Sequence, residues 1–256
     1  VHDRGWASLF TCNHDQPRVV TRWGDDSTEE NRAHSAKAFG MLVHLHRGTP
    51  YIYQGEELGM TGAHFTELGQ YRDLEAINAY RQRVTEAKVQ SGESMMDALA
   101  MFGRDNARTP MQWDGSKYAG FTAADTPKEP WISVNPNHVE INAAAQFDDP
   151  DSVYTFYKKL VNLRHNSPVV AAGEWELVDD NDEAVYAFTR TLGERRMLVM
   201  INLSGRHAPL PAHAQELLRN GVAEDHVVLS TYDAIHSVKS IAKGELSEWE
   251  GVVVQL

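Results

Sequence analysis

The segment WASLFTCNHDQPR, residues 6–18, joins an apolar run directly to a polar cluster. The run at 6–12 is short and aromatic, which is typical of a strand buried in a parallel sheet. Asn13, His14 and Asp15 follow at its carboxyl end, the edge at which α/β barrels place their catalytic groups. We therefore predict a role in catalysis or binding for His14 and Asp15. The alternative interpretation is a turn in which Asp15 caps a helix.

The next forty residues predict a parallel α/β unit. Ser27 and Glu30 have the spacing of a capping box at the start of a helix. The apolar face of that helix is formed by Ala36, Phe39, Leu42, Val43 and His46. A short aromatic strand at 50–53 then ends in a second polar loop at 54–57. Strand, loop, helix, strand and loop in this order indicate parallel strands joined by a helix.

A long irregular segment follows, from residue 60 to about 150. Helices are predicted at 73–88 and 94–102, and the remainder is rich in Gly, Pro, Asn and Trp. A segment of this length without regular structure usually carries function in a compact fold. A further helix with an apolar face is predicted between the start signals at 149–151 and the Ser-Pro pair at 167–168.

The sequence pattern changes after Pro168, where short apolar runs alternate with turn-forming stretches. The runs are EWELV, AVYAF, MLVMIN, HVVLS and VVVQL. The stretches between them include DDNDE at 179–183, TLGER at 191–195 and SGRHAP at 204–209. This alternation predicts an antiparallel β domain at 167–256.

Composition excludes several classes of partner. The formal net charge is −12, from 36 acidic and 24 basic residues, so the chain repels nucleic-acid phosphates and anionic lipid. No run approaches the roughly 18 apolar residues of a membrane span. With the single cysteine Cys12 and no close histidine ligand spacing, we expect neither metal nor cofactor, and a cytoplasmic location. The chain opens on Val1 and enters an apolar run at once, so we expect a piece of a longer polypeptide.

Three blocks of sequence resemble glycoside hydrolase family 13. NHDQPR at 13–18 resembles its fourth conserved region, and TPYIYQGEELGM at 49–60 resembles its last barrel strand and loop. GRDNARTPMQW at 103–113, with GFT, PWI and VNPN after it, is similar to oligo-1,6-glucosidases, dextran glucosidases and trehalose-6-phosphate hydrolases. The resemblance implies that residues 1–166 are the C-terminal part of a catalytic (β/α)8 barrel with an excursion at about 60–150. It implies an antiparallel all-β C-terminal domain at 167–256.

The same resemblance implies roles for individual residues. The family removes terminal α-linked glucose from short oligosaccharides with retention, using an Asp nucleophile, a Glu acid/base and a second Asp. Asp15 matches the second Asp, which stabilises the transition state through the 2- and 3-hydroxyls of the innermost sugar. His14 matches a histidine that holds the same sugar. Arg104 matches the arginine that recognises the 4-hydroxyl, paired with an Asp outside this chain, which makes the enzyme exo-acting.

Other motif residues have less specific interpretations. Glu56 and Glu57 follow the last strand, so Glu56 is a candidate substrate contact on the aglycone side. Alternatively, the pair anchors a helix N-terminus. Tyr51 and Tyr53 are expected in the barrel core. Gln112 and Trp113 are candidates for a stacking wall, but core packing is the favoured interpretation for Trp113. Asp105 and Arg108 are expected to form an ion pair that orders their loop. Arg18 is expected to fix the loop that carries Asp15. Cys12 is expected to be buried.

The nucleophile and the acid/base are absent from the chain. The family nucleophile lies in a Gly-x-Arg-x-Asp pattern and the acid/base follows the next strand, and neither context occurs here. Retaining hydrolysis requires two carboxyl groups about 5–5.5 Å apart. We therefore expect the isolated chain to be inactive, with the missing N-terminal half of the same barrel as its partner and an oligosaccharide as substrate.

Two alternatives stay open. A trehalose-6-phosphate hydrolase has similar motifs. A non-catalytic relative, such as the heavy chains that escort amino-acid transporters, would carry a membrane span and tend to lose catalytic residues. The presence of Asn13, His14, Asp15 and Arg104 argues against the second alternative.

Overall fold

The computed structural model describes residues 5–179 and 182–256, and these divide into two compact units. Unit 1 consists of Val1–Thr11, Gly24–Tyr51 and Thr155–Leu256, and unit 2 of Cys12–Trp23 and Ile52–Tyr154. These units alternate along the chain and do not follow the boundary expected at 166/167, which stays a prediction. The turn predicted at 179–183 includes residues 180–181, which lie outside the described residues.

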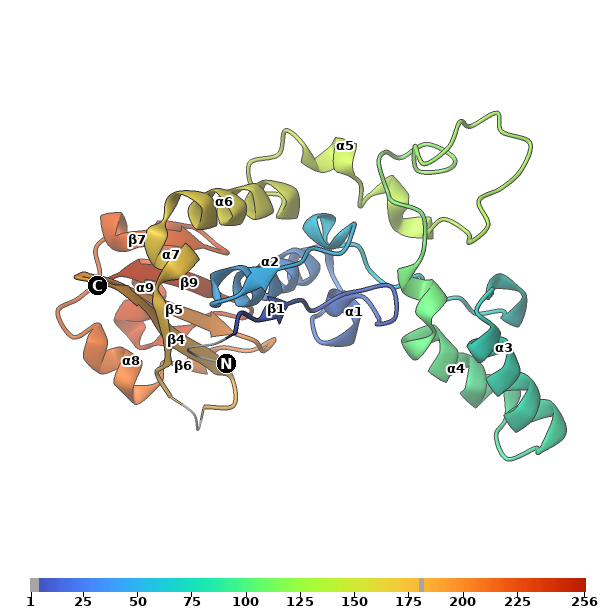
Figure 1. Cartoon of the computed structure of the whole chain (residues 1–256), viewed down its shortest axis with the longest axis horizontal. Helices are drawn as coiled ribbons and strands as arrows, with labels where there is room; N and C mark the ends of the chain where they lie inside the picture. Colours follow the sequence, from blue (N-terminus) through green and yellow to red (C-terminus); the bar gives the residue numbers. More distant parts are fainter. Residues whose placement is uncertain (1–4, 180–181) are drawn as a thin grey trace. The chain divides into compact units, whose positions relative to one another are not determined.

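Unit 1 holds every strand of the described residues and five of the helices labelled in Figure 1, α2, α6, α7, α8 and α9. Its elements are β1 (Ser8–Leu9), α2 (Glu29–Leu45), β2 (Thr49–Pro50), α6 (Val153–Asn166, from Thr155 onward), α7 (Pro168–Ala172), β3 (Glu174–Leu177), β4 (Val185–Leu192), β5 (Arg195–Asn202), β6 (Ala208–Pro209), α8 (Ala212–Leu217), η6 (Glu224–His226), β7 (Val227–Ser230), α9 (Ala234–Lys243), β8 (Glu245–Leu246) and β9 (Gly251–Gln255).

Unit 2 is built of short helices joined by irregular chain. Its elements are α1 (Val19–Arg22), η1 (Glu56–Leu58), η2 (Leu68–Gln70), α3 (Leu74–Tyr80), the π-helical η3 (Arg81–Glu86), α4 (Gly92–Phe102), η4 (Arg104–Ala107), η5 (Pro136–Val139) and α5 (Ala143–Gln146). The two helices predicted in the excursion are therefore confirmed, as α3 with η3 and as α4. A separate core of this unit packs Phe65, Tyr71, Ala76, Met95, Leu99 and Ile132 together.

The predicted parallel pair of strands is confirmed, but each strand has only two residues. Ser8 pairs with Thr49 and Leu9 with Pro50. The expected burial was wrong, because Trp6 and Phe10 are exposed and Tyr51 is 57 % exposed. A buried parallel strand needs neighbours at both edges and cover on both faces. Within the described residues this sheet has only two strands, so its aromatic side chains face solvent.

Helix α2 begins one residue later than expected. Thr28 is the N-cap and accepts a hydrogen bond from Asn31 N at 3.1 Å, so the predicted capping box of Ser27 and Glu30 was wrong. Ala36, Phe39 and Val43 are buried as predicted, whereas Leu42 and His46 are half-buried. At the other end, Arg164 donates to the carbonyl oxygens of His44 and His46, which satisfies acceptors that the helix leaves free.

The C-terminal region contains the predicted antiparallel sheet, in the order β3-β4-β5-β9-β7. The expectation of strands alone was wrong, because α7, α8 and α9 also lie between residues 167 and 256. Helix α9 packs against β7 and β8, and its buried face includes Ser237 and Ile241. The sheet's core includes Leu198, Met200, Val252 and Val254. The region is therefore a sheet covered by helices.

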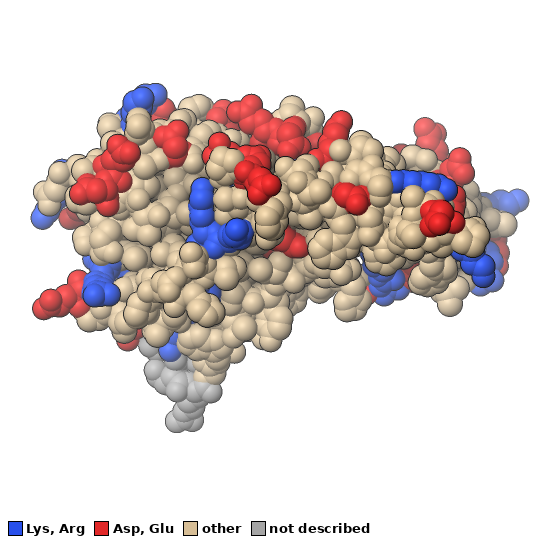
Figure 2. Space-filling view, turned by 90° about the horizontal axis from the view of Figure 1, so that it is seen from above, with Lys and Arg blue, Asp and Glu red and all other residues tan. Residues whose placement is uncertain are grey.

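No helix in the described ranges is both long and apolar enough to cross a membrane. Figure 2 shows acidic side chains spread over much of the displayed face, as expected for a net charge of −12.

Candidate carbohydrate site

A tight turn in unit 2 presents Asp15. Asn13 Oδ1 accepts a hydrogen bond from Asp15 N at 2.8 Å, and Cys12 Sγ accepts one from Val19 N at 3.0 Å. Cys12 is buried as predicted, and burial, followed by the negative charge of Glu56, raises the pKa of its thiol to about 12. The turn is thus fixed on both sides of Asp15 while its carboxylate stays 48 % exposed.

The structure brings together three of the four predicted site residues around that turn, His14, Asp15 and Arg104. Asp15 Oδ1 lies 3.4 Å from Arg104 Nη1, and Oδ2 lies 3.3 Å from His14 Nε2. Arg108 joins them: its Nη2 donates to Asp15 Oδ1 at 2.9 Å and its Nε to the carbonyl of His14 at 2.7 Å. Charge-assisted contacts of this kind orient the carboxylate without burying it.

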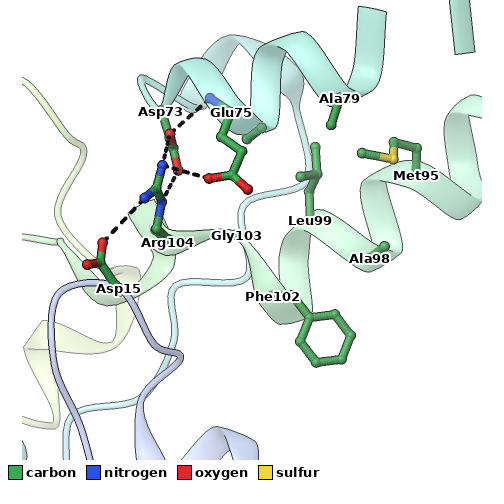
Figure 3. A pocket seen from close by; sticks show the side chains of 11 residues that line it. Asp15, Asp73, Glu75, Ala79, Met95, Ala98, Leu99, Phe102, Gly103 and Arg104 are labelled. Atoms are coloured by element: carbon green, nitrogen blue, oxygen red, sulfur yellow. Dashed lines mark hydrogen bonds and ion pairs between the residues drawn. The ribbon is translucent and has the colours of Figure 1, made fainter. Parts of the chain in front are cut away.

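Arg104 has its principal partners within the chain. Its Nε and Nη2 each donate to Asp73 at 2.7 Å, and Glu75 Oε2 lies 3.0 Å from Nη2 (Figure 3). The hydrogen bond from Arg104 lowers the pKa of Asp73, and the same bond raises the pKa of Arg104. Sequence reasoning missed Asp73 and Glu75, because the resemblance directed attention to an Asp outside the chain.

Asp105 anchors the loop that carries both arginines. Its buried carboxylate accepts hydrogen bonds from the backbone N–H groups of Arg72 at 2.6 Å and Asp73 at 2.7 Å. Its other oxygen lies 3.5 Å from Arg108 Nη1, which is the ion pair expected from the sequence. One carboxylate therefore connects the start of α3 to the arginine-bearing turn η4.

A cavity of about 530 Å³ opens beside these charges, between α3 and α4 (Figure 3). Its charged lining residues are Asp15, Asp73, Glu75 and Arg104. Its remaining lining residues are Ala76, Ala79, Met95, Ala98, Leu99, Phe102 and Gly103. A mostly apolar wall with a few convergent polar groups is typical of small-molecule sites.

The structure does not bring Glu56 to this site. Glu56 is only 3 % exposed, because it begins the short helix η1 and faces the protein interior. Glu57 Oε2 accepts from Gly55 N at 2.9 Å, so this pair corresponds to the alternative of an N-terminal anchor. Burial raises the pKa of Glu57.

Arg18 Nη1 donates to the carbonyl of Gln54 at 2.6 Å, and its guanidinium stacks over the half-buried Tyr53 ring at 4.6 Å. Arg18 therefore connects the segment that carries Asp15 to the loop after residue 53.

Trp113 is exposed, so the expectation of core packing was wrong. Its neighbour Gln112 is buried and donates a hydrogen bond to the Ile141 carbonyl. Within the described residues, no three His, Cys, Asp or Glu side chains are arranged to hold a metal ion.

Comparison with known proteins shows the family to which the chain is similar. The family described as "Alpha amylase, catalytic domain" matches residues 1–173. An oligo-1,6-glucosidase of Parageobacillus thermoglucosidasius is 42 % identical over 262 residues, which cover 100 % of this chain and 43 % of that protein. A glucan 1,6-alpha-glucosidase of Streptococcus pneumoniae is 45 % identical, covering 90 % of this chain and 42 % of the relative.

A solved structure is similar over nearly the same extent. The trehalose-6-phosphate hydrolase of Bacillus licheniformis gives a TM-score of 0.82 at 36 % identity, covering 98 % of this chain and 43 % of that one. The chain thus spans less than half the length of the relatives it matches.

Proposed function

This chain belongs to the alpha-amylase catalytic-domain family, and from that premise we propose that it is part of a retaining, exo-acting α-glucosidase. Its substrate would be a short oligosaccharide with a terminal glucose in α-1,6 or α-1,4 linkage. The observation that carries the proposal is the exposed Asp15 carboxylate, held by Arg108 at 2.9 Å and Arg104 at 3.4 Å. The names of the relatives, oligo-1,6-glucosidase and glucan 1,6-alpha-glucosidase, support this substrate class.

Asp15 is the proposed transition-state stabiliser. As the sugar ring flattens toward an oxocarbenium ion, hydrogen bonds from its hydroxyls to a fixed carboxylate strengthen. Such bonds accelerate the reaction only because they are stronger in the transition state than in the bound substrate. The contacts from Arg108 and the Asn13 turn support this role, since an oriented carboxylate need not reorganise during the reaction.

His14 and Arg104 are the proposed binding groups for the same sugar. Both carry hydrogen-bond donors close to Asp15. An arginine held by Asp73 and Glu75 also closes one side of the cavity, which would limit the pocket to one terminal sugar. The structure offers no similar argument for Glu56, which is buried.

The rest of the catalytic machinery is proposed to come from preceding residues. We propose that this chain forms the C-terminal part of a (β/α)8 barrel whose N-terminal half supplies the nucleophile and the acid/base. Neither the Gly-x-Arg-x-Asp pattern nor the strand that would follow it occurs in this sequence. We also propose a cytoplasmic location, because the only cysteine is a buried free thiol.

Substitution of Asp15 in the intact enzyme tests the proposal. Asp15→Asn keeps the shape of the side chain and removes its charge, so kcat for an α-glucoside should fall by orders of magnitude while the circular dichroism spectrum is unchanged. Asp125→Asn is the matched control, because Asp125 is exposed in the same unit and does not line the cavity. Near-normal turnover by Asp15→Asn would remove this residue from the mechanism.

A further inference from the structure

A second cavity lies in unit 1, whereas His14, Asp15 and Arg104 belong to unit 2. It has a volume of about 500 Å³ and lies between α8, the turn that follows α8, and α9. This volume is within the range of roughly 300–1,000 Å³ found for small-ligand sites. None of its lining residues has a part in the proposed function, and we call it the α8–α9 cavity.

The floor of the α8–α9 cavity is part of a packed core. Leu210, Leu218 and Ile241 line the cavity and are buried in the core that includes side chains of β5 and β9. Val222 packs against the same core from the turn after α8. Side chains fixed in this way present an apolar surface that a ligand can cover without rearrangement.

Two glycines keep the floor open at its turns. Gly221 and Gly244 line the cavity with φ values of +81° and +79°, and beyond their chain neighbours no described atom lies within 4 Å of the position that a Cβ would take. Gly244 caps the C-terminus of α9, and Gly221 N donates to the carbonyl of Leu218 at 2.9 Å after the end of α8. Glycine adopts a positive φ without strain, so both turns form without a side chain in this space.

The charged groups of the cavity are both basic. Arg219 and Lys243 line it, and the lining contains no Asp or Glu, in a chain whose formal net charge is −12. Both side chains are exposed, and neither takes part in an ion pair among the described residues. The carboxylate nearest in sequence to Lys243, that of Glu245, lies 3.7 Å from His207 Nδ1 instead. Two cations without a protein partner favour an anionic group on the ligand.

The negative end of α9 is compensated beside the cavity. A helix C-terminus carries a partial negative charge, which a cation in the last turn offsets. Lys243 is the last residue of α9, and Gly244 N donates to the carbonyls of Ser240 and Ile241. Leu210 N donates in turn to the Gly244 carbonyl at 2.9 Å. The full charge closest to this helix end in the lining is therefore positive.

The rest of the lining offers little to a polar ligand. Gln215 is the uncharged lining residue with a polar side chain, and its Nε2 donates to the Leu210 carbonyl at 2.8 Å. Hydroxyl groups placed over Leu210, Leu218 or Ile241 would lose their bonds to water without replacement. Hydrocarbon has no such loss, because burial of apolar surface is itself favourable. The ligand that fits is apolar over most of its length and anionic at one end.

We propose that the α8–α9 cavity binds an unbranched fatty acid of medium chain length. The hydrocarbon tail lies on the floor formed by Leu210, Leu218 and Ile241, and the carboxylate lies at the exposed side chains of Arg219 and Lys243. This site does not depend on the proposed glucosidase activity, because every lining residue lies at 210–244.

Three ligands test the tail and the charge separately. Octanoate, butyrate and 1-octanol are titrated into the intact enzyme by isothermal titration calorimetry. Each methylene that leaves water strengthens binding about fourfold, so octanoate should bind at least about tenfold more tightly than butyrate. Octanoate should also bind at least about threefold more tightly than 1-octanol, because each exposed ion pair contributes modestly. Equal dissociation constants in either comparison would overturn the proposal, as would the absence of saturable binding at millimolar octanoate.

Removal of the two cations locates the carboxylate. Arg219→Gln combined with Lys243→Gln should make octanoate bind no more tightly than 1-octanol, while the affinity for 1-octanol stays the same. Arg195→Gln combined with Lys239→Gln is the matched control, because both residues are exposed in unit 1 outside the lining and the net charge changes equally. A preference for octanoate that survives the first pair, or that disappears equally in the second, would show that Arg219 and Lys243 do not hold the carboxylate.

A larger side chain on the floor locates the tail. Ala242→Leu fills part of the lining on α9 with a good helix former, so it should weaken the binding of octanoate and 1-octanol together. Ala212→Leu, at an exposed position of α8 outside the lining, should change neither affinity. Unchanged binding in Ala242→Leu would place the tail elsewhere.

Asp15→Asn separates this site from the proposed sugar site. Octanoate should bind this variant with unchanged affinity, because Asp15 belongs to unit 2 and does not line the α8–α9 cavity. Loss of octanoate binding would place the ligand at the sugar site and overturn the inference, whatever the variant does to turnover.

Discussion

Asp73 binds Arg104 through two parallel hydrogen bonds of 2.7 Å, from Nε to Oδ2 and from Nη2 to Oδ1. Asp73 is itself fixed, because its backbone N–H donates to Asp105 and its carboxylate caps α3 by accepting from Glu75 N at 3.0 Å. A planar guanidinium held along one edge cannot rotate. The orientation of Arg104 toward Asp15 is therefore determined by the first residues of α3.

Loss of this pair should weaken substrate recognition more than it weakens the fold. In the intact enzyme, Asp73→Asn removes the charge that holds Arg104 and should lower kcat/KM for p-nitrophenyl α-glucoside about ten- to hundredfold, the equivalent of about 1.5–3 kcal/mol for a hydrogen bond to a charged group. Asp97→Asn, at an exposed position on α4, is the control. An unchanged kcat/KM with Asp73→Asn would mean that Arg104 is positioned by other contacts.

The fold could be predicted where local pattern decides it. The parallel pair β1–β2, helix α2 and the sheet strands all follow from periodicity and turn residues. The exposure of Tyr51 could not be predicted, because the apolar pattern of its strand does not reveal that the sheet has only two strands in the described chain. Helix α9 was missed although Asp233 at its N-cap and Gly244 after its end are ordinary helix signals. These signals were not used, because the region was expected to contain strands alone.

The site could be predicted only where a motif marked it. His14, Asp15 and Arg104 lie in blocks with a family resemblance, and the structure brings them together. Asp73 lies 31 residues before Arg104, across η3 and α4, and no periodicity connects positions that far apart. Glu56 was misplaced for a related reason. The sequence pattern of a carboxylate after a strand does not distinguish a side chain that faces a cavity from one that faces the protein interior.

The isolated 256-residue chain should not hydrolyse p-nitrophenyl α-glucoside. Retaining hydrolysis needs a nucleophile and an acid/base, and this sequence contains neither of the family's contexts for them. The measurement is release of p-nitrophenol at high enzyme concentration, with Asp15→Asn as the control for contaminating activity. Turnover that disappears in Asp15→Asn would show that the chain contains a complete catalytic set and would contradict this prediction.

Acid should destabilise unit 1 through His44 and His46. Burial, followed by the charge of Arg164, lowers the pKa of His44 to about 4, and burial followed by Arg190 does the same for His46. Between the ordinary value of 6.5 and about 4, the unfolded chain binds these protons and the folded chain does not. Stability is therefore full above pH 6.5 and falls as the pH decreases toward 4, by up to about 1.4 kcal/mol per pH unit for each histidine.

Urea unfolding between pH 4.5 and 7.5 measures this slope. The double substitution His44→Gln with His46→Gln should flatten the dependence of the unfolding free energy on pH, even if it lowers stability at every pH. His165→Gln, at an exposed position on α6, should leave the slope unchanged. A wild-type slope in the double variant would assign the acid sensitivity to other groups.

Gly55 should tolerate no side chain, for two separable reasons. Its φ is +88°, which L-residues with a Cβ rarely adopt, and a Cβ there would overlap Met60 Sδ and lie 3.3 Å from Arg18 Nη1. Gly221 has a similar φ of +81° but open space around its Cβ position among the described residues. Gly221→Ala should therefore cost only the backbone term, about 1–2 kcal/mol, whereas Gly55→Ala should add about 1–3 kcal/mol for overpacking. Guanidinium unfolding of the two variants compares them directly, and equal losses would mean that Met60 moves aside freely and that the loop holding Arg18 is less tightly packed than its contacts indicate.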